Sequence, residues 1–217
     1  GHLFKLLADP GDEILVPVPG YPLLEVLTRL DSVRLVHYPL RYDSRRGWRI
    51  DLERLGNTIS TRTRAIVVVS PNNPTGSFLK RDELAAITTL CERHGAALIV
   101  DEVFSGYGRG SDSSRVGTAV GCTAALTFVL NGVSKMLGLP QIKLSWIHVS
   151  GPHELCAQAR ERLGFVTDAY LSVGAPAMNA APYLLRGREA LQAQIRARLA
   201  GNEERLRRLL GRAAGVE

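Results

Sequence analysis

Short runs of hydrophobic residues alternate along the chain with longer stretches in which hydrophobic and polar residues are mixed. The short runs are rich in β-branched residues, are bounded by turn-forming residues and are too short to be helices, so they predict β-strands. Four runs are clear and two are weaker. The clear strands are expected at residues 65–69, 97–100, 126–130 and 146–149, and the weaker ones at residues 14–16 and 34–38.

The stretches between these runs predict helices. In residues 79–94 the hydrophobic side chains fall near one face of a helix, and Gly95 is a residue type that commonly ends helices. Leucines and isoleucines at three- and four-residue steps predict a long helix over residues 188–212, with Gly201 as its weak point. Two shorter helices are expected at residues 22–30 and 152–163.

Strands that alternate with helices favour a mostly parallel sheet covered by helices on both faces. We therefore predict an α/β protein with three layers, α/β/α. The sequence contains no internal repeat, low-complexity tract or evident linker, so a single domain is the simplest organisation for its 217 residues.

Composition narrows the class of function. The chain is 45% hydrophobic and 22% charged, a balance typical of globular domains, and no run reaches the roughly 18 apolar residues that a membrane span needs. Its three cysteines and five histidines are widely scattered. They form neither a disulfide framework nor a metal-ligand spacing, which favours a reducing, cytoplasmic setting without a metal site or a membrane partner.

The net charge of +6 is a feature shared with proteins that bind nucleic acids. Eight arginines and four glutamates lie in residues 186–217, so this segment alone accounts for +4 of the net charge. An excess confined to one segment is typical of a solvated helix face rather than of a basic groove across a domain. We therefore expect no nucleic-acid partner.

Polar residues follow three of the predicted strands, at residues 70–76, 101–104 and 131–135. In an open α/β sheet the ligand lies beyond the carboxyl ends of the strands, where these clusters would bring an amide, a carboxylate and an amine together. Taken singly, each cluster has a structural explanation. Asn-Pro-Thr-Gly is a turn sequence, Asp101 can cap the following segment, and Lys135 can be an exposed loop lysine. Their shared placement at strand ends favours a binding site.

Four segments establish a resemblance to a known family. They are PGDEILVPVPGYP, SPNNPTG, DEVFSGY and NGVSKMLGLPQIKLSW, and in this order and spacing they resemble the class I/II aminotransferases, which are fold-type I pyridoxal-phosphate enzymes. The resemblance runs over most of the chain. It implies that the α/β/α unit is an aminotransferase-like large domain with pyridoxal 5'-phosphate as its cofactor.

The resemblance assigns a role to each of five residues. Lys135 matches the catalytic lysine that holds the cofactor as a Schiff base, and Asp101 matches the carboxylate that pairs with the pyridine nitrogen. Asn73 matches the amide that hydrogen-bonds the phenolic oxygen of the ring. Tyr21 lies where an aromatic side chain stacks on the cofactor, and Lys143 matches the basic residue that binds the phosphate.

These residue types suit the implied chemistry. A desolvated lysine has a lowered pKa, so its neutral amine can attack an aldehyde and later move a proton. A buried carboxylate favours a protonated pyridine nitrogen, and the protonated ring accepts the electrons left when the substrate Cα–H bond breaks. The implied reaction moves an amino group between an amino acid and a 2-oxo acid.

Three positions depart from the pattern of the family. Phe104 occupies the place of a tyrosine that bonds the phenolic oxygen in many relatives, and phenylalanine cannot make that bond. Gly132 replaces a serine that often contacts the phosphate. Lys143 replaces the usual arginine, which removes the bidentate geometry and keeps the charge. Because Lys135 and Asp101 are retained, we interpret these changes as a subfamily difference.

Several alternatives share some of these features. Cystathionine-type β-lyases and aminocyclopropane-carboxylate synthases are similar at the lysine and the aspartate. A non-catalytic aminotransferase-like sensor domain of a transcription regulator and an inactive remnant are further alternatives. A dinucleotide-binding dehydrogenase is disfavoured, because residues 106–110 are glycine-rich without the GxGxxG spacing, and we interpret them as a mobile surface loop.

The resemblance also implies a division of the chain. Residues 1–187 are expected to form the cofactor-binding large domain, and residues 188–217 a helix that leads to a C-terminal small domain. The family's phosphate-binding loop would precede Gly1, which is not an initiating methionine, and its carboxylate-binding arginine would follow Glu217. A homodimer is expected for the intact protein, with an amino acid and a 2-oxo acid as substrates.

Overall fold

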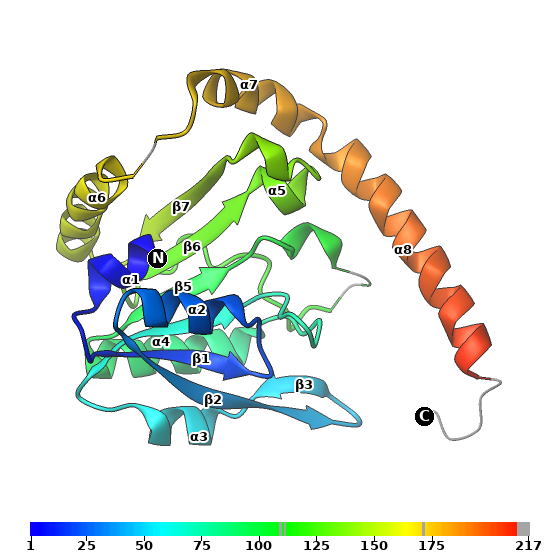
Figure 1. Cartoon of the computed structure of the whole chain (residues 1–217). Coiled ribbons are helices and arrows are strands. Elements are labelled where there is room, and N and C mark those ends of the chain that lie inside the picture. The colour runs from blue at the N-terminus through cyan, green and yellow to red at the C-terminus, as the bar shows by residue number, and fades with distance from the viewer. Residues whose placement is uncertain (109, 111, 171, 212–217) are drawn as a thin grey trace.

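The computed structural model describes residues 1–108, 110, 112–170 and 172–211, and its centre is one seven-stranded sheet (Figure 1). The strands are β1 (Glu13–Val18), β2 (Arg34–Asp43), β3 (Gly47–Ile50), β4 (Thr63–Val69), β5 (Ala97–Asp101), β6 (Thr127–Gly132) and β7 (Ser145–Ser150). They are arranged in the order β3-β2-β1-β4-β5-β6-β7.

The sheet is mostly parallel, as the sequence predicts. β1, β2, β4, β5 and β6 run parallel, whereas β3 and β7 pair antiparallel with β2 and β6 at the two edges. All six predicted strands are present. The sequence pattern does not predict β3, because its four residues form a short edge strand in which every residue is only half-buried.

Helices cover both faces of the sheet, which confirms the three-layer α/β/α prediction. On one face Leu55 and Ile87 belong to a core cluster with residues of β1, β4 and β5, and on the other face Phe4 and Leu163 belong to a second cluster. The first layer contains α3 (Leu52–Thr58) and α4 (Arg81–His94), and the second contains α1 (His2–Leu7), α2 (Leu23–Leu30) and α6 (His153–Asp168).

Helix α4 begins two residues later than the pattern predicts. Lys80 is extended and forms an isolated β-bridge with Arg115, so the chain is still strand-like at this point. The Glu83 carboxylate then accepts a hydrogen bond of 2.8 Å from the backbone N–H of Lys80 and so caps the first turn. Gly95, at φ 64°, ends the helix in the left-handed conformation, as expected from the sequence.

The predicted helices at residues 22–30 and 152–163 are present as α2 and α6, and α6 continues to Asp168.

Four of the described helices, α1, α3, α5 (Val133–Met136) and α7 (Ala175–Arg186), lack a clear signal in the sequence. Helices α1, α3 and α5 are shorter than a periodic pattern can mark. Helix α7 has no buried residue among those described, so no core-facing stripe marks it.

The last helix, α8 (Arg188–Leu210), follows the predicted segment, and Gly201 does not interrupt it. The expected helix end at residue 212 lies outside the described residues. Figure 1 shows α8 leading from α7 past the side of the sheet on which β1 and β2 end. There α8 contacts the 3₁₀ turn η1 (Ser105–Tyr107). Among the helices described, none combines the length and apolar character needed to cross a membrane.

Candidate active site

A cavity of about 590 Å³ lies at the carboxyl ends of β4, β5 and β6. The five residues singled out by the sequence all line it, although they come from separate segments of the chain. These residues are Tyr21, Asn73, Asp101, Lys135 and Lys143. Hydrophobic side chains of α1, α2 and the sheet form much of the remaining wall, among them Phe4, Leu24, Leu27, Ile99 and Leu130.

The cavity opens beside the point where the strand order reverses. The chain leaves β1 toward β2 on one side, whereas β4 lies on the other side of β1, and such switch points form crevices at the strand ends. Tyr21 follows β1 and Asn73 follows β4. Their side chains therefore reach one cavity from the two loops that border the switch point.

Asn72 joins these two loops and was not singled out from the sequence. Its side-chain Nδ2 donates to the backbone carbonyl of Pro19 at 3.2 Å and to the hydroxyl of Thr75 at 2.9 Å. Asn72 is buried, and Asn73 is half-buried at the cavity wall. The pair Asn72-Asn73 was the signal in the sequence that could have indicated this role, because one amide can hold the loop while its neighbour faces the ligand.

Asp101 is the last residue of β5, where it pairs in register with Val69 of β4 and Leu130 of β6. Its Oδ1 accepts a hydrogen bond of 3.1 Å from the backbone N–H of Val103. Burial raises the pKa of the Asp101 carboxyl, because desolvation penalises the charged form, and the Val103 hydrogen bond opposes this rise. A cation bound beside Asp101 would offset the free-energy cost of holding its charged carboxylate away from water.

Lys135 lies in the short helix α5, directly after β6. Its ammonium nitrogen lies 5.8 Å from the centroid of the Phe104 ring. The side chain is exposed at the cavity, which differs from the desolvated lysine expected from the sequence. A ligand in the cavity could reach this amine directly.

Gly132 packs against Leu144, the neighbour of Lys143 in the chain. A Cβ atom on Gly132 would lie 2.9 Å from the carbonyl oxygen of Leu144, so the backbone approach at this position excludes the serine of many relatives without local movement. Lys143 follows the 3₁₀ turn η2 (Pro140–Ile142) with φ 56°, in the left-handed region. Its side chain is exposed and lines the cavity beside Ser134.

The glycine-rich segment at residues 106–110 lies elsewhere. Residues 105–107 form η1, and no described residue of residues 106–110 lines the cavity of Lys135. Residue 109 lies outside the described residues, so the interpretation of the segment as a mobile loop stays a prediction. Gly106 instead faces α8, where its carbonyl accepts a hydrogen bond of 3.0 Å from Arg196.

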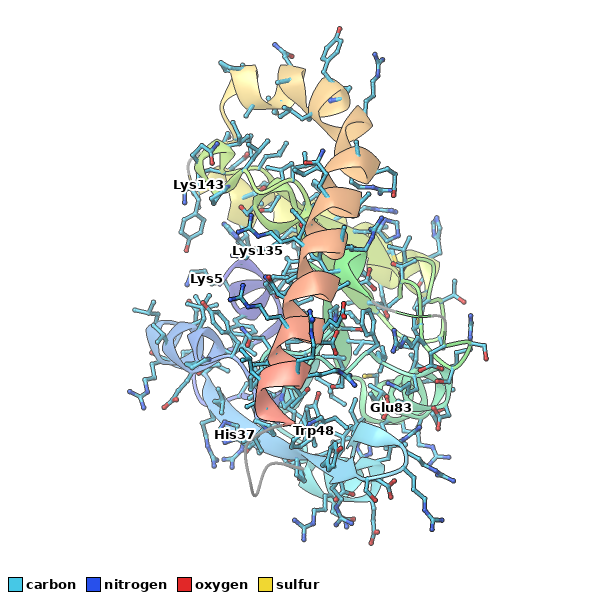
Figure 2. All side chains as sticks on the ribbon, turned by 90° about the vertical axis from the view of Figure 1, so that its right-hand side faces the viewer. Lys5, His37, Trp48, Glu83, Lys135 and Lys143 are labelled. Atoms are coloured by element: carbon cyan, nitrogen blue, oxygen red, sulfur yellow. The ribbon has the colours of Figure 1, made fainter. Side chains whose placement is uncertain are left out.

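The donor set suits a flat, phosphate-bearing ring. The ammonium groups of Lys135 and Lys143, the half-buried Asp101 carboxylate, the Asn73 amide and the Tyr21 ring line a cavity whose walls are largely hydrophobic. Ammonium groups bind phosphate and carbonyl oxygens, and hydrophobic walls accept the faces of an aromatic ring. Figure 2 shows Lys135 and Lys143 on the side of the molecule that α8 crosses.

Comparisons with known proteins agree with this geometry. The whole chain, residues 1–217, matches the family model described as Aminotransferase class I and II. The alanine aminotransferase of Mycobacterium tuberculosis (strain H37Rv) is 31% identical over 188 residues, which are 87% of this chain and 43% of that protein. The glutamate-pyruvate aminotransferase AlaA of Escherichia coli K12 is 30% identical over 187 residues, which are 86% of this chain and 45% of that protein.

Among solved structures, the alanine aminotransferase from Pyrococcus furiosus superposes with a TM-score of 0.87 at 26% identity, over 99% of this chain and 53% of that one. The chain thus spans about half the length of the relatives it matches. The match over the full chain, together with the α/β/α fold, establishes that this chain belongs to the class I and II aminotransferases.

Proposed function

We propose that this chain is the cofactor-binding part of an aminotransferase that moves an amino group between an amino acid and a 2-oxo acid, with pyridoxal 5'-phosphate held on Lys135. The single observation that supports this proposal best is the placement of Lys135, Asp101, Asn73, Tyr21 and Lys143 around one cavity. The family to which the chain belongs supports it independently.

In the proposed site each residue binds one part of the cofactor. Lys143 binds the phosphate as a point charge, and Asn73 donates a hydrogen bond to the phenolic oxygen. Asp101 would pair with the protonated ring nitrogen. Burial of the Asp101 carboxylate favours this pairing, because a neighbouring cation offsets the free-energy cost of removing the negative charge from water. Tyr21 covers one face of the ring.

Lys135 has two tasks in this proposal. Its Nζ would hold the cofactor until the amino group of the substrate takes its place. The bound cofactor supplies an electron sink for the bond that breaks at the substrate Cα. The freed Nζ would then accept the proton from Cα and return it, acting as base and then as acid. Its exposed position leaves it room to move between these tasks.

The relatives suggest the substrates. The M. tuberculosis and P. furiosus proteins are named alanine aminotransferases and the E. coli protein a glutamate-pyruvate aminotransferase. We propose alanine and glutamate as amino donors, with the corresponding 2-oxo acids as acceptors. We further propose that residues 188–217 connect the domain of residues 1–187 to a small domain, and that the intact protein is a cytoplasmic homodimer.

The proposal is tested by mapping the cofactor on the chain. Pyridoxal phosphate is added, excess is removed, borohydride fixes any adduct, and peptide mass spectrometry locates it. We expect an adduct on Lys135 in the wild-type chain, and no adduct in the cavity of folded Lys135→Ala or Lys135→Arg chains, where Lys143 is still present. The second variant keeps the positive charge at position 135. A folded wild-type chain without an adduct on Lys135 contradicts the proposal.

A second measurement identifies the reaction. The loaded chain is mixed with alanine or glutamate, and the products are counted against the bound cofactor. Amino transfer is expected to give one 2-oxo acid per cofactor without free ammonia. The test for β-elimination uses cystathionine, because it carries a thiolate leaving group at Cβ that alanine and glutamate lack; ammonia and pyruvate released from it in equal amounts would indicate β-elimination. An adduct that survives all three compounds unchanged would indicate a binding domain without turnover.

A further inference from the structure

The helix that carries Lys135 is very short. Helix α5 consists of residues Val133–Met136 and has no side-chain cap at its N-terminus. The last carbonyls of any helix lack partners within the helix, and in α5 this applies to most of its residues. The carbonyl of Val133 accepts backbone hydrogen bonds from Leu137 at 2.9 Å and Leu139 at 3.4 Å.

Two side chains from distant segments bond the remaining end of α5. The hydroxyl of Tyr107 donates to the backbone carbonyl of Lys135 at 2.5 Å. The side-chain Nε2 of Gln192, in α8, donates to the carbonyl of Met136 at 3.2 Å. The backbone of the lysine turn is therefore held by η1 and by α8, and not only by the sheet that precedes it.

Gln192 is built into this contact. It is the one buried residue among those described in α8, with 4% of its surface exposed. A Cβ atom on Gly106 would lie 2.4 Å from its Nε2, so a glycine at that position makes the approach of the amide possible. Arg196, one turn further along α8, donates to the carbonyl of Gly106 at 3.0 Å. Helix α8 is thus bonded both to η1 and to α5.

The backbone is the main anchor of the proposed catalytic amine. The Lys135 side chain is exposed, and its ammonium group makes no ion pair with any residue that the structure describes. A displaced turn would therefore move Nζ with only the contact to the Phe104 ring to oppose it. Displacements of about 1 Å in a reacting group can cost about a hundredfold in rate. Burial raises the pKa of the Tyr107 phenol, so this donor stays protonated at neutral pH.

We propose that Tyr107 and Gln192 are positioning residues for Lys135, and that the docking of α8 on η1 and α5 sets the place of the cofactor-binding amine. The inference rests on the proposed function, because it assumes that Lys135 holds the cofactor. In this proposal α8 supports the active site, in addition to its proposed role as the connection to a small domain. Figure 2 shows Lys135 beside α8, in agreement with the hydrogen bond between Gln192 and Met136.

The test uses Tyr107→Phe and Gln192→Met, which remove the donors and nearly keep the shapes of the side chains. Their matched controls are Tyr183→Phe, at an exposed tyrosine of α7, and Gln194→Met, at an exposed glutamine of α8. Three quantities are measured in the 217-residue chain: the rate at which the borohydride-fixed adduct on Lys135 forms, the pH midpoint of the near-visible cofactor band, and the melting temperature.

We expect each donor-removing variant to slow adduct formation roughly threefold to tenfold, which corresponds to the loss of one hydrogen bond, and to shift the pH midpoint of the band. Both controls should match the wild type. A purely structural role would lower the melting temperature and leave the pH midpoint of the folded fraction in place. If Tyr107→Phe fails to fold, Gln192→Met decides, because its side chain lies outside the two core clusters.

The outcomes separate the two proposals. A wild-type chain with an adduct on Lys135, and variants with unchanged rates and unchanged midpoints, would overturn the positioning role alone. A wild-type chain without the adduct would overturn the assignment of Lys135, and with it the positioning role. Slower formation and a shifted midpoint in both variants, with unchanged controls, would establish the link between α8 and the lysine.

Discussion

The ammonium group of Lys135 lies 5.8 Å from the centroid of the Phe104 ring, within the range of a cation–π contact. This ring attracts the amine and offers no hydrogen bond to a ligand. The site thus combines a lysine at the end of one strand with an aromatic ring that follows the neighbouring strand. It lacks a hydroxyl at a position where many members of the resembled family have one.

Restoring that hydroxyl should change the titration of the bound cofactor. In Phe104→Tyr we expect the pH midpoint of the near-visible cofactor band to fall, because a donated hydrogen bond stabilises the deprotonated phenolic oxygen. A pH titration followed by absorption measures the midpoint. Phe165→Tyr, at an exposed phenylalanine of α6, is the matched control. An unchanged midpoint in Phe104→Tyr would mean that this side chain does not reach the phenolic oxygen.

Lys143 should determine how tightly the cofactor is retained. In Lys143→Ala we expect the dissociation constant of pyridoxal phosphate to rise roughly tenfold to a hundredfold, the range for hydrogen bonds to charged groups. Lys143→Arg should retain the affinity, because a guanidinium also binds phosphate. Equilibrium dialysis measures both. Arg160→Ala on α6 removes an equal charge from an exposed position and should leave the affinity unchanged. Equal losses of affinity in Lys143→Ala and Arg160→Ala would argue against a direct contact between Lys143 and the phosphate.

Asp101 should lower the stability of the cofactor-free chain at neutral pH. Burial raises the pKa of its carboxyl in the folded chain above the ordinary value of 3.8, so the folded chain holds this proton more tightly than the unfolded chain. The contribution of this carboxyl to the free energy of unfolding is fully present below pH 3.8. It is lost as the pH rises through the raised folded-state value.

Asp101→Asn removes this titration. We expect the variant to be more stable than the wild type at neutral pH, with a difference that shrinks as the pH falls toward 3.8, and to retain pyridoxal phosphate poorly. Urea unfolding at several pH values measures the first effect. Asp9→Asn, at an exposed aspartate, is the control. A constant stability difference at all pH values would contradict the assigned role of burial.

Glu83 should be among the most important polar side chains for stability. It is 2% exposed, and its two carboxylate oxygens accept hydrogen bonds from the backbone N–H groups of Ile50 at 2.9 Å and Lys80 at 2.8 Å. Glu83→Ala leaves both donors without this partner, and we expect a loss of about 2–4 kcal/mol in the free energy of unfolding. Urea denaturation measures it against Glu92→Ala, an exposed glutamate of the same helix that should change little.

Much of the fold and the proposed site can be predicted from the sequence, because their signals are local. Runs such as residues 65–69 and 97–100 are β-branched and bounded by turns, and the structure confirms them as β4 and β5. Asp101 directly follows a predicted strand, and Lys135 is the fifth residue after another. Since parallel strands end at one edge of the sheet, order along the chain was enough to predict their meeting.

The short elements could not be predicted in this way. Helix α5 and strand β3 each contain four residues, which is too few for a periodic pattern, and α7 buries none of its described residues. These elements form because of neighbours that are distant in sequence. Arg49 of β3, for example, forms an ion pair with Glu83, which lies 34 residues further along the chain.

The sequence by itself determined the fold class, the family and five candidate residues, because hydrophobic periodicity and motif order are properties of neighbouring residues. Only the tertiary structure decided that Lys135 is exposed, that Asn72 links the loops of Tyr21 and Asn73, and that Tyr107 and Gln192 bond the lysine turn. Each of these three hydrogen bonds joins residues 28 or more positions apart, where backbone geometry and burial decide which donors meet which acceptors.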